Sequence, residues 1–374
     1  MKNNFLALLK IRPLLVCLAG LFCVCGRSAA EEEKVLNIYN WASYIADDTI
    51  SNFEKETGIK VNYDIFDTNE ILYARLMARH TGYDIVVPSD NFASLQIKGG
   101  MLKVLDKSKL PNLVNMDPLT QAALAKLDPG NEHLVTWLWG YTTLGLNTKL
   151  VKAALGNLKM PDNIWELIFN PVYASKLSDC GISFMDSGNE VMPLALMYLG
   201  KNGFSENPDD YRAASLMLEK IRPTIRVFST SSYTSDLANG ELCVAMGYSG
   251  DINMARQRAI DANNGNDIVA LIPDRGALFY FDTMAIPTDA PHPENALRWM
   301  NYIMRPEVHA SLTNKVQYAN PNLKSLPYVR KDIAENRTIF LSDEDKKKMV
   351  SPEPLTQLIR RIESRAFTKF KTGY

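Results

Sequence analysis

The sequence has few of the residues that usually carry catalysis or bind metals. It contains 5 cysteines and 4 histidines in 374 residues, and no two histidines have HxxxH or HExxH spacing. There is no Walker sequence, and no GxGxxG motif follows a predicted strand. The run 247–251 (GYSGD) resembles a nucleophile elbow but lacks the second glycine at the required spacing. We therefore expect no enzyme activity, no cofactor and no metal site.

The sequence also lacks an apolar run long enough to span a membrane. The run 14–24 has about 11 residues, whereas a spanning helix needs roughly 20. Basic residues precede this run (Lys2, Lys10, Arg12), and the small residues 28–30 follow it. This order is typical of a cleavable export signal. We predict a signal peptide over residues 1–30, cleaved near Ala30, and a soluble exported protein; the alternative is an N-terminal anchor.

Strong positive charge is absent as well. The first 30 residues hold four basic and no acidic residues, so their removal lowers the net charge from −1 to −5. An acidic mature chain argues against nucleic acid and mildly favours cationic partners.

Cysteine is scarce once the signal is removed, because Cys17, Cys23 and Cys25 leave with it. Cys180 and Cys243 remain, and their spacing fits no metal motif. In an oxidising compartment they form either one disulfide or two buried free thiols, and we expect the disulfide.

The mature chain begins with alternating strands and helices. The pattern predicts a strand at 35–39, a helix between Asp48 and Gly58, a strand at 60–66, a helix at 69–80 and a strand at 83–87. Such β-α-β units form a parallel sheet with right-handed crossovers. Because ligands bind beyond the carboxyl ends of parallel strands, we expect Trp41, Tyr44 and the turn 88–92 on one rim.

The rest of the chain indicates a second α/β unit. Residues 133–147 read as an extended crossing segment with a possible hinge at Gly140, and strands are predicted at 181–185 and 242–248. Residues 268–287 read as two strands joined by a turn at 274–276. Further helices are predicted around 165–169 and at 191–199, 293–304 and 306–314, and the tail from Glu353 is amphipathic.

These crossings predict two lobes. Lobe 1 would comprise residues 31–138 with about 262–335, and lobe 2 about 139–261 with about 336–374. Lobes joined by more than one crossing form a cleft that can close about a hinge.

Aromatic residues stand beside carboxylates at several predicted strand ends. Ring faces attract cations by roughly 0.5 to 2 kcal/mol each, and carboxylates accept strong hydrogen bonds from ammonium groups. Such a site would suit a linear diamine, although each ring taken singly could equally be core packing. These positions are Trp41 with Tyr44, Tyr248 with Asp251, Tyr280-Phe281-Asp282, and Gln317-Tyr318.

Several long stretches resemble the periplasmic polyamine-binding proteins of ABC importers, and the putrescine-binding branch most. They are IYNWASYIADDTISNFEKETGIKVNYDIFDTNE, YDIVVPSDNF, LDKSKLPNL, CGISFMDSGNEV, DLANGELCVAMGYSGD, GALFYFDTMAIP and QYANPN. The resemblance covers essentially the whole mature chain. It implies the type II periplasmic-binding-protein fold, in which two lobes, each a mainly parallel sheet flanked by helices, close on one polyamine and deliver it to permease subunits. It also implies a disulfide between Cys180 and Cys243, and we expect a monomer.

The same resemblance implies the ligand-binding residues. Asp251 and Asp282 would be the main ammonium partners, and Phe281 is expected to point into the core. The full implied set is Trp41, Tyr44, Ser89, Glu190, Tyr248, Asp251, Tyr280, Asp282 and Tyr318.

Four positions depart from the putrescine-binding pattern. Tyr248 stands in place of tryptophan, Tyr280 in place of phenylalanine, Ala42 in place of a small hydroxyl residue, and Asn253 in place of an aromatic residue. They leave open the choice among putrescine, cadaverine and spermidine. Binding of an amino acid or an opine, an exported hydrolase and a ligand-sensing subunit stay as alternatives.

Overall fold

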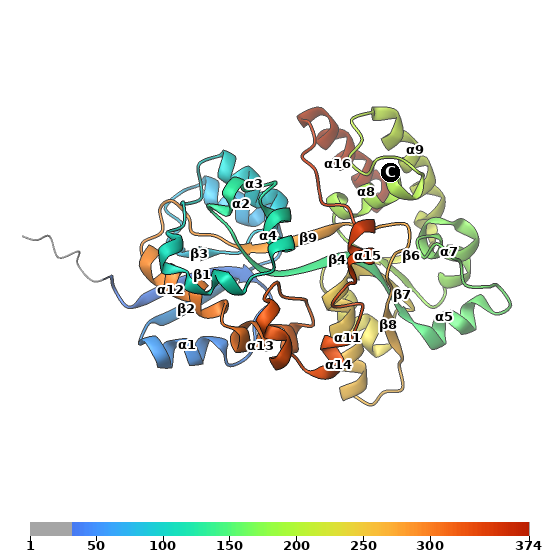
Figure 1. Ribbon diagram of the computed structural model, residues 1–374. Coiled ribbons are helices and arrows are strands. Elements are labelled where there is room, and N and C mark those ends of the chain that lie inside the picture. The colour runs from blue at the N-terminus through green and yellow to red at the C-terminus, as the bar shows by residue number, and fades with distance from the viewer. Residues whose placement is uncertain (1–31, 374) are drawn as a thin grey trace, which may run out of the picture. The chain divides into compact units, whose positions relative to one another are not determined.

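Two sheets organise the part of the chain that the computed structural model describes, residues 32–373 (Figure 1). The predicted signal peptide lies outside these residues. The first sheet has the order β2 (Lys60–Phe66), β1 (Val35–Trp41), β3 (Ile85–Val86), and both pairings are parallel. The helices α1 (Thr49–Thr57) and α2 (Asn69–Met77) are the crossovers that parallel neighbours require.

The second sheet is mixed. Its order is β6 (Ile225–Phe228), β5 (Ile182–Phe184), β7 (Val244–Tyr248), β4 (Val135–Asn147), β8 (Ile268–Ala270). β5 is parallel to both of its neighbours, whereas β4 is antiparallel to β7 and to β8.

The long strand β4 connects the two sheets (Figure 1). Residues 135–141 pair with β9 (Phe279–Met284), and residues 142–147 pair with β7 and β8. β9 in turn meets the end of the first sheet through the bridges Val86–Ala285 and Ser89–Asp282. The predicted crossing segment is therefore confirmed. The predicted strands at 268–287 are present too, but β8 and β9 each pair with β4 rather than with each other.

Gly140 lies near the middle of β4, where space is tight. A Cβ atom there would come 2.7 Å from the Tyr280 hydroxyl oxygen and 3.2 Å from Ser249 Oγ. A larger residue would need the Tyr280 side chain on β9 and the Ser249 hydroxyl at the start of the helix α11 (Ser249–Asp261) to move. The glycine therefore allows close packing at the crossing.

Helices cover both faces of each sheet and bury separate cores. The core clusters of the first sheet contain Phe53 of α1 with Ile38 on one face and Leu72 of α2 with Tyr39 on the other. The helices that pack around this sheet include α3 (Asp90–Lys98), α12 (Pro293–Ile303) and α13 (Pro306–Val316). Alternation along β1 sends successive side chains to opposite faces, so both faces need a cover.

In the second sheet, one core is covered by α8 (Gly188–Tyr198), α9 (Pro208–Ile221) and α16 (Gln357–Thr372), and the other by α10 (Tyr233–Asn239) and α11. The remaining α-helices are α4 (Pro118–Leu124), α5 (Thr148–Leu155), α6 (Glu166–Phe169), α7 (Pro171–Leu177), α14 (Lys331–Ala334) and α15 (Asp343–Lys348). Short 3-10 turns occupy 107–109, 111–115, 129–131, 222–224 and 323–328. Among residues 32–373, no helix has the length and apolar character needed to cross a membrane.

The segment after β3 differs from the sequence-based prediction. The sequence indicated only a turn at 88–92, but Ser89 adopts an extended conformation and α3 starts at the next residue, Asp90. The predicted helix 69–80 also ends earlier, at Met77. Arg79 and His80 have positive φ angles of 55° and 51°, which ends the helical hydrogen bonding there.

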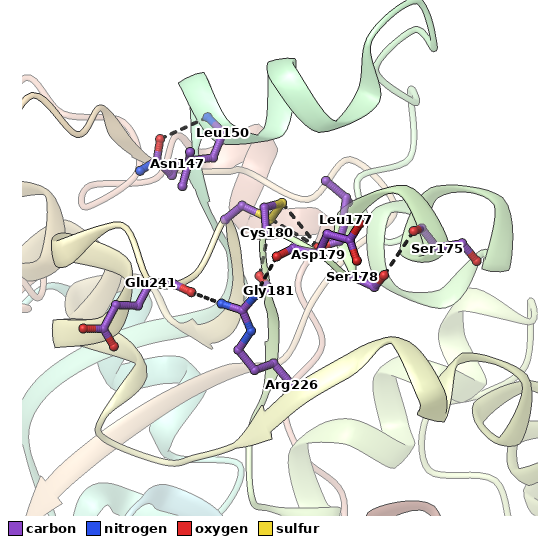
Figure 2. The surroundings of a disulfide bond; sticks show 11 residues. Asn147, Leu150, Ser175, Leu177, Ser178, Asp179, Cys180, Gly181, Arg226 and Glu241 are labelled. Carbon is purple, nitrogen blue, oxygen red and sulfur yellow. Dashed lines mark hydrogen bonds between the residues drawn. A yellow bond between two sulfur atoms is a disulfide. The ribbon is translucent and has the colours of Figure 1, made fainter.

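The predicted disulfide between Cys180 and Cys243 is confirmed (Figure 2). Cys180 lies between α7 and β5, and Cys243 immediately precedes β7, so pairing of β5 with β7 brings them together. Arg226 of β6 donates hydrogen bonds to the carbonyl oxygens of Asp179 and Glu241, next to the two loops that carry the cysteines (Figure 2).

Candidate ligand-binding site

Asp282 is a buried carboxylate on β9 held by two hydroxyl groups. It is 5% exposed. The Ser89 hydroxyl donates to Oδ1 at 2.7 Å and the Tyr44 hydroxyl donates to Oδ2 at 2.8 Å. Ser89 is itself fixed by Asn69, which donates to the Ser89 hydroxyl and accepts from its backbone N–H, both at 3.0 Å. The loops at the carboxyl end of the first sheet therefore position this carboxylate.

Asp251 is a second carboxylate with the same kind of support. It lies in the first turn of α11 and is partly buried. The hydroxyls of Tyr318 and Tyr233 donate to its two oxygens at 2.7 and 2.5 Å. Tyr233 is oriented in turn by the backbone N–H of Tyr248, which donates to its hydroxyl at 3.2 Å.

Glu190 is a third, partly buried carboxylate, in the first turn of α8. Thr142, the first β4 residue to pair with β7, donates its hydroxyl to Oε2 at 2.5 Å. The Tyr248 hydroxyl donates to Oε1 at 3.4 Å. All three carboxylates are thus held by neutral hydroxyl donors.

Tyrosine rings connect the surroundings of these carboxylates. Tyr44 meets Tyr318 edge to face at 5.0 Å between ring centroids, and Tyr248 meets Tyr280 in the same way at 5.1 Å. The Tyr280 hydroxyl is buried and has no hydrogen-bond partner among the described residues. A buried hydroxyl without a partner is costly unless something else satisfies it.

Burial makes the three carboxyl groups weaker acids than usual, because it raises their pKa values. It raises the pKa of Asp282 to about 6, with a further contribution from the negative charge of Asp251. It raises the pKa of Glu190 to about 7 and also raises the pKa of Asp251. Hydroxyl donors partly oppose these shifts. The carboxylates therefore repel each other and gain most from a cation placed among them.

The protein itself supplies little compensating positive charge. Within residues 32–373, no lysine or arginine forms an ion pair with Asp251, Asp282 or Glu190. Arg258 of α11 lowers the pKa of Asp251, but its guanidinium donates to Ser235 at 3.0 Å. No group of acidic, histidine or cysteine side chains suited to a metal occurs in this part of the chain.

Most of the residues implied by the resemblance come together in the structure, with one exception. Trp41 donates its indole N–H to the carbonyl of Val87 at 2.9 Å and packs against Phe66 at 4.5 Å. Within residues 32–373, neither this hydrogen bond nor this ring contact involves a carboxylate. Phe281 packs against Phe279 in the core, as expected.

The position Asn253 serves the fold rather than the carboxylate cluster. Its amide donates to the carbonyl of Ser249 at 2.8 Å and to the Thr338 hydroxyl at 3.1 Å, and its oxygen accepts from Asn336 at 3.0 Å. Ala42 is exposed. Of the positions that differ from the putrescine-binding pattern, Tyr248 and Tyr280 therefore lie near a carboxylate of the cluster, and Asn253 does not.

Sequence reasoning missed four residues that hold or surround the carboxylates: Asn69, Asp90, Thr142 and Tyr233. Tyr233 lies in a serine-rich stretch on a short helix, and no pattern marks it. Thr142 lies in the predicted crossing segment, but the hydrogen bond from its hydroxyl to Glu190 becomes visible only in the structure.

A surface hollow of about 540 Å³ lies elsewhere and shares no residue with this cluster. It is lined by Tyr39, Asp64, Ile65, Ile71, Arg75 and Tyr83. Within it the Tyr83 hydroxyl already donates to Asp64 at 2.9 Å, and Arg75 lies 5.9 Å from the Tyr83 ring centroid. Its carboxylate already has a hydroxyl donor and its cation already lies over a ring, so the carboxylate cluster is the stronger candidate.

The chain belongs to the bacterial extracellular solute-binding protein family, whose family model matches residues 48–340. It is 45% identical over 360 residues to the putrescine-binding periplasmic protein SpuD of Pseudomonas aeruginosa (strain UCBPP-PA14), covering 96% of this chain and 97% of that protein. It is 44% identical over 355 residues to the putrescine-binding periplasmic protein PotF of Escherichia coli (strain K12), covering 95% and 96%. The resemblance stated from the sequence is confirmed.

Solved structures confirm the predicted fold, that of type II periplasmic binding proteins. A putative spermidine/putrescine ABC transporter from Listeria monocytogenes has a TM-score of 0.79 and 29% identity, covering 91% of this chain and 100% of that chain. The binding protein MotA of A. tumefaciens B6, in complex with glucopine, shares the fold alone, with a TM-score of 0.64, 17% identity and coverage of 90% and 99%. One fold therefore accommodates chemically different ligands.

Proposed function

We propose that the protein captures a polyamine, putrescine in the first place, and delivers it to the permease of an ABC importer without chemical change. The observation that carries this proposal is the set Asp282, Asp251 and Glu190. They are buried or partly buried carboxylates that have hydroxyl donors and form no ion pair within the described residues 32–373. The relatives described as putrescine-binding periplasmic proteins support it.

The chemistry of the cluster matches a linear diamine. One ammonium group would be bound by Asp282 and the other by Asp251 or Glu190, in charge-assisted hydrogen bonds of about 2.7–2.9 Å. The apolar methylenes would lie against the rings of Tyr44, Tyr248, Tyr280 and Tyr318, whose faces also attract cations. Ser89 would orient Asp282, and Trp41 would contribute only an outer wall.

We propose that binding is coupled to closure of two lobes. Asp282 lies on β9 where it meets the first sheet at Ser89, whereas Asp251 and Glu190 lie on the helices α11 and α8, which cover the second sheet. Asn189 of α8 also donates to Glu70 of α2 at 3.1 Å, an exposed contact between helices of the two sheets. A ligand that contacts both sides stabilises the closed arrangement. The predicted lobe boundaries stay a proposal. The pairing of β8 with residues 145–147 supports placing the return to lobe 1 after Ala270 rather than near residue 262.

The alternative ligands make a different demand on the site. An amino acid or an opine carries a carboxylate and needs a basic partner, but none of the proposed site residues is basic. The same set contains no histidine or lysine that could act as a base for Ser89, whose hydroxyl donates to the Asp282 carboxylate instead, and this disfavours a hydrolase. A sensing role would use the same ligand and would differ only in the protein that receives it.

Calorimetric titration with putrescine, cadaverine, spermidine and spermine tests the proposal. We expect at least one of them to bind in the micromolar range or tighter, and 4-aminobutyrate, in which a carboxylate replaces one ammonium, not to bind. If no polyamine binds below roughly 1 mM, which corresponds to about −4 kcal/mol, the polyamine assignment is wrong.

We further propose that the chain is exported to the periplasm, loses residues 1–30 and acts as a monomer. Mass spectrometry of the periplasmic fraction would show the new N-terminus near Glu31. Light scattering would give the mass of one chain; a dimer would contradict the last point.

A further inference from the structure

Asp90 is a buried carboxyl group that takes no part in the hydrogen bonds described above for Asp282, Asp251 and Glu190. It is the first residue of α3, directly after Ser89, and its side chain is 0% exposed. Its Oδ1 accepts from the backbone N–H of Asn91 at 2.9 Å, whereas Oδ2 has no hydrogen-bond partner among the described residues. Burying an ionised carboxylate with an unsatisfied oxygen is very unfavourable.

The charges around Asp90 are mostly negative. The elements that pack most extensively against α3 are α2 and β9. β9 carries Asp282, and α2 carries Glu70 and Arg75. The negative charge of Glu190, on the helix α8 that covers the second sheet, also raises the pKa of Asp90. Arg75 lies over the ring of Tyr83, in the surface hollow described above. Asp90 forms no ion pair in the described part of the chain.

Burial raises the pKa of Asp90 to about 8, and the negative charges of Asp282 and Glu190 raise it further, while backbone N–H groups of Asn91 and Phe281 oppose the shift. The ligand-free protein therefore keeps this carboxyl protonated at neutral pH. Asp282, in contrast, carries negative charge under the same conditions.

We propose that Asp90 is a fourth carboxyl group of the site, which carries a proton in the ligand-free protein and releases it when a polyamine binds. This inference rests on the proposed function. Burial is the main cause that holds the proton on Asp90, and the negative charge of Asp282 adds to it. The ammonium group that binds Asp282 offsets this added charge and supplies a counter-charge for an ionised Asp90. The O–H bond of the Asp90 carboxyl then breaks, the proton leaves to the buffer, and the new carboxylate adds its negative charge to that of Asp282 in attracting the ligand.

The direct test is the number of protons released on binding. Putrescine, or whichever of the four polyamines binds best, is titrated at pH 7 in buffers of different ionisation enthalpy, and the slope of the heat gives the proton count. We expect Asp90→Asn to release roughly half a proton less than the wild type. Asp67→Asn, which changes an exposed acid between β2 and α2, should match the wild type.

Affinity gives a second readout. At pH 6 Asp90 is protonated in the free wild type, so binding to wild type and Asp90→Asn should differ little. At pH 8.5 the wild type should bind roughly tenfold tighter, because only it can place a negative charge at this position. Equal proton release and an equal affinity ratio at both pH values would overturn the role of Asp90.

A measurement without ligand separates this inference from the proposed function. Between about pH 4 and pH 8 the folded protein keeps a proton on Asp90 that the unfolded chain loses, so folded stability falls as pH rises. The neutral Asp90→Asn variant lacks this contribution, and its melting temperature should fall less over that window. If the melting temperatures of variant and wild type change equally with pH over this window, the conclusion that Asp90 is protonated in the folded protein is wrong. If no polyamine binds, the proposed function fails; if one binds and the proton count is unchanged, only the Asp90 inference fails.

Discussion

Two pairs of buried or partly buried aspartates in this protein have different partners. Asp84 and Asp128 are both 0% exposed and accept hydrogen bonds from backbone N–H groups and a histidine ring. Asp251 and Asp282 accept hydrogen bonds only from hydroxyl groups, and no cationic side chain pairs with them in residues 32–373. All four are acids in a poorly solvated environment, so burial alone does not separate them.

The difference lies in what neutralises each charge. For Asp128, His133 supplies both a ring nitrogen 2.9 Å from Oδ1 and a backbone N–H, and Leu134 supplies another N–H. We call such a carboxylate complete, because backbone N–H groups and a histidine ring of the same fold already surround its oxygens. A tyrosine or serine hydroxyl donates a single hydrogen bond and brings no positive charge. Asp251 and Asp282 are therefore incomplete, and a bound cation would complete them.

The largest effect should follow from removing both incomplete carboxylates. Asp251→Asn with Asp282→Asn deletes two charge-assisted contacts, which together are worth roughly 3 to 6 kcal/mol of binding free energy. Polyamine binding should disappear from calorimetry, while the melting temperature stays near that of the wild type, because neutral amides are easier to bury. Retained micromolar affinity would show that these residues are not the ammonium partners.

Changing a complete carboxylate should affect stability instead. Asp128→Ala leaves two buried backbone N–H groups and a histidine ring without their acceptor, a cost of roughly 2 to 4 kcal/mol in the free energy of unfolding. Urea denaturation measures this loss. The folded fraction should bind polyamine with wild-type affinity. A large loss of affinity without a loss of stability would remove the distinction between the two pairs.

Lowering the pH should weaken binding through the incomplete carboxylates. Glu190 and Asp282 have pKa values of about 7 and about 6, so they take up protons as the pH falls through this range. Affinity should be highest above about pH 8 and fall at least about tenfold between pH 7 and pH 5. Titrations across that range check the slope. The sign for ligand-free stability is opposite: raised pKa values mean that the folded state holds extra protons, so stability increases as the pH falls towards about 4.

The smallest effect is expected for Tyr280→Phe. Its hydroxyl has no partner in the described chain, so the variant should keep the wild-type melting temperature. If the bound ligand or a water satisfies this hydroxyl, its loss should weaken binding roughly two- to tenfold. Affinity equal to that of the wild type would show that the hydroxyl does not contribute to the site. A drop in melting temperature would point to a structural role.

The sequence predicted the first sheet well because the local signals there agree. Strand β2 runs over 60–66 as expected, and α1 ends before Gly58, whose φ of 70° fits the left-handed end of a helix. The sequence did not reveal α3, because a Pro-Ser-Asp-Asn run is typical of both a turn and a helix start. Nor could it show that β8 and β9 pair with β4, since pairing between distant strands leaves no local pattern.

The site was predicted in outline and incompletely. Aromatic and acidic residues at strand ends indicated Tyr44, Asp251 and Asp282, and the family resemblance added Ser89 and Glu190. Asp90 was missed because an aspartate at a helix start is ordinary, and only its complete burial makes it unusual. The expected role of Trp41, to line one face of the ligand, stays a prediction; its strand-end position did not reveal that its ring packs on Phe66.

A crystal structure of the protein with putrescine would test the central claim most directly. The account predicts one ammonium nitrogen about 2.7–2.9 Å from a carboxylate oxygen of Asp282, and the other within the same distance of Asp251 or Glu190. The methylenes would lie between the tyrosine rings. A ligand whose nitrogens contact none of these three carboxylates would contradict the account.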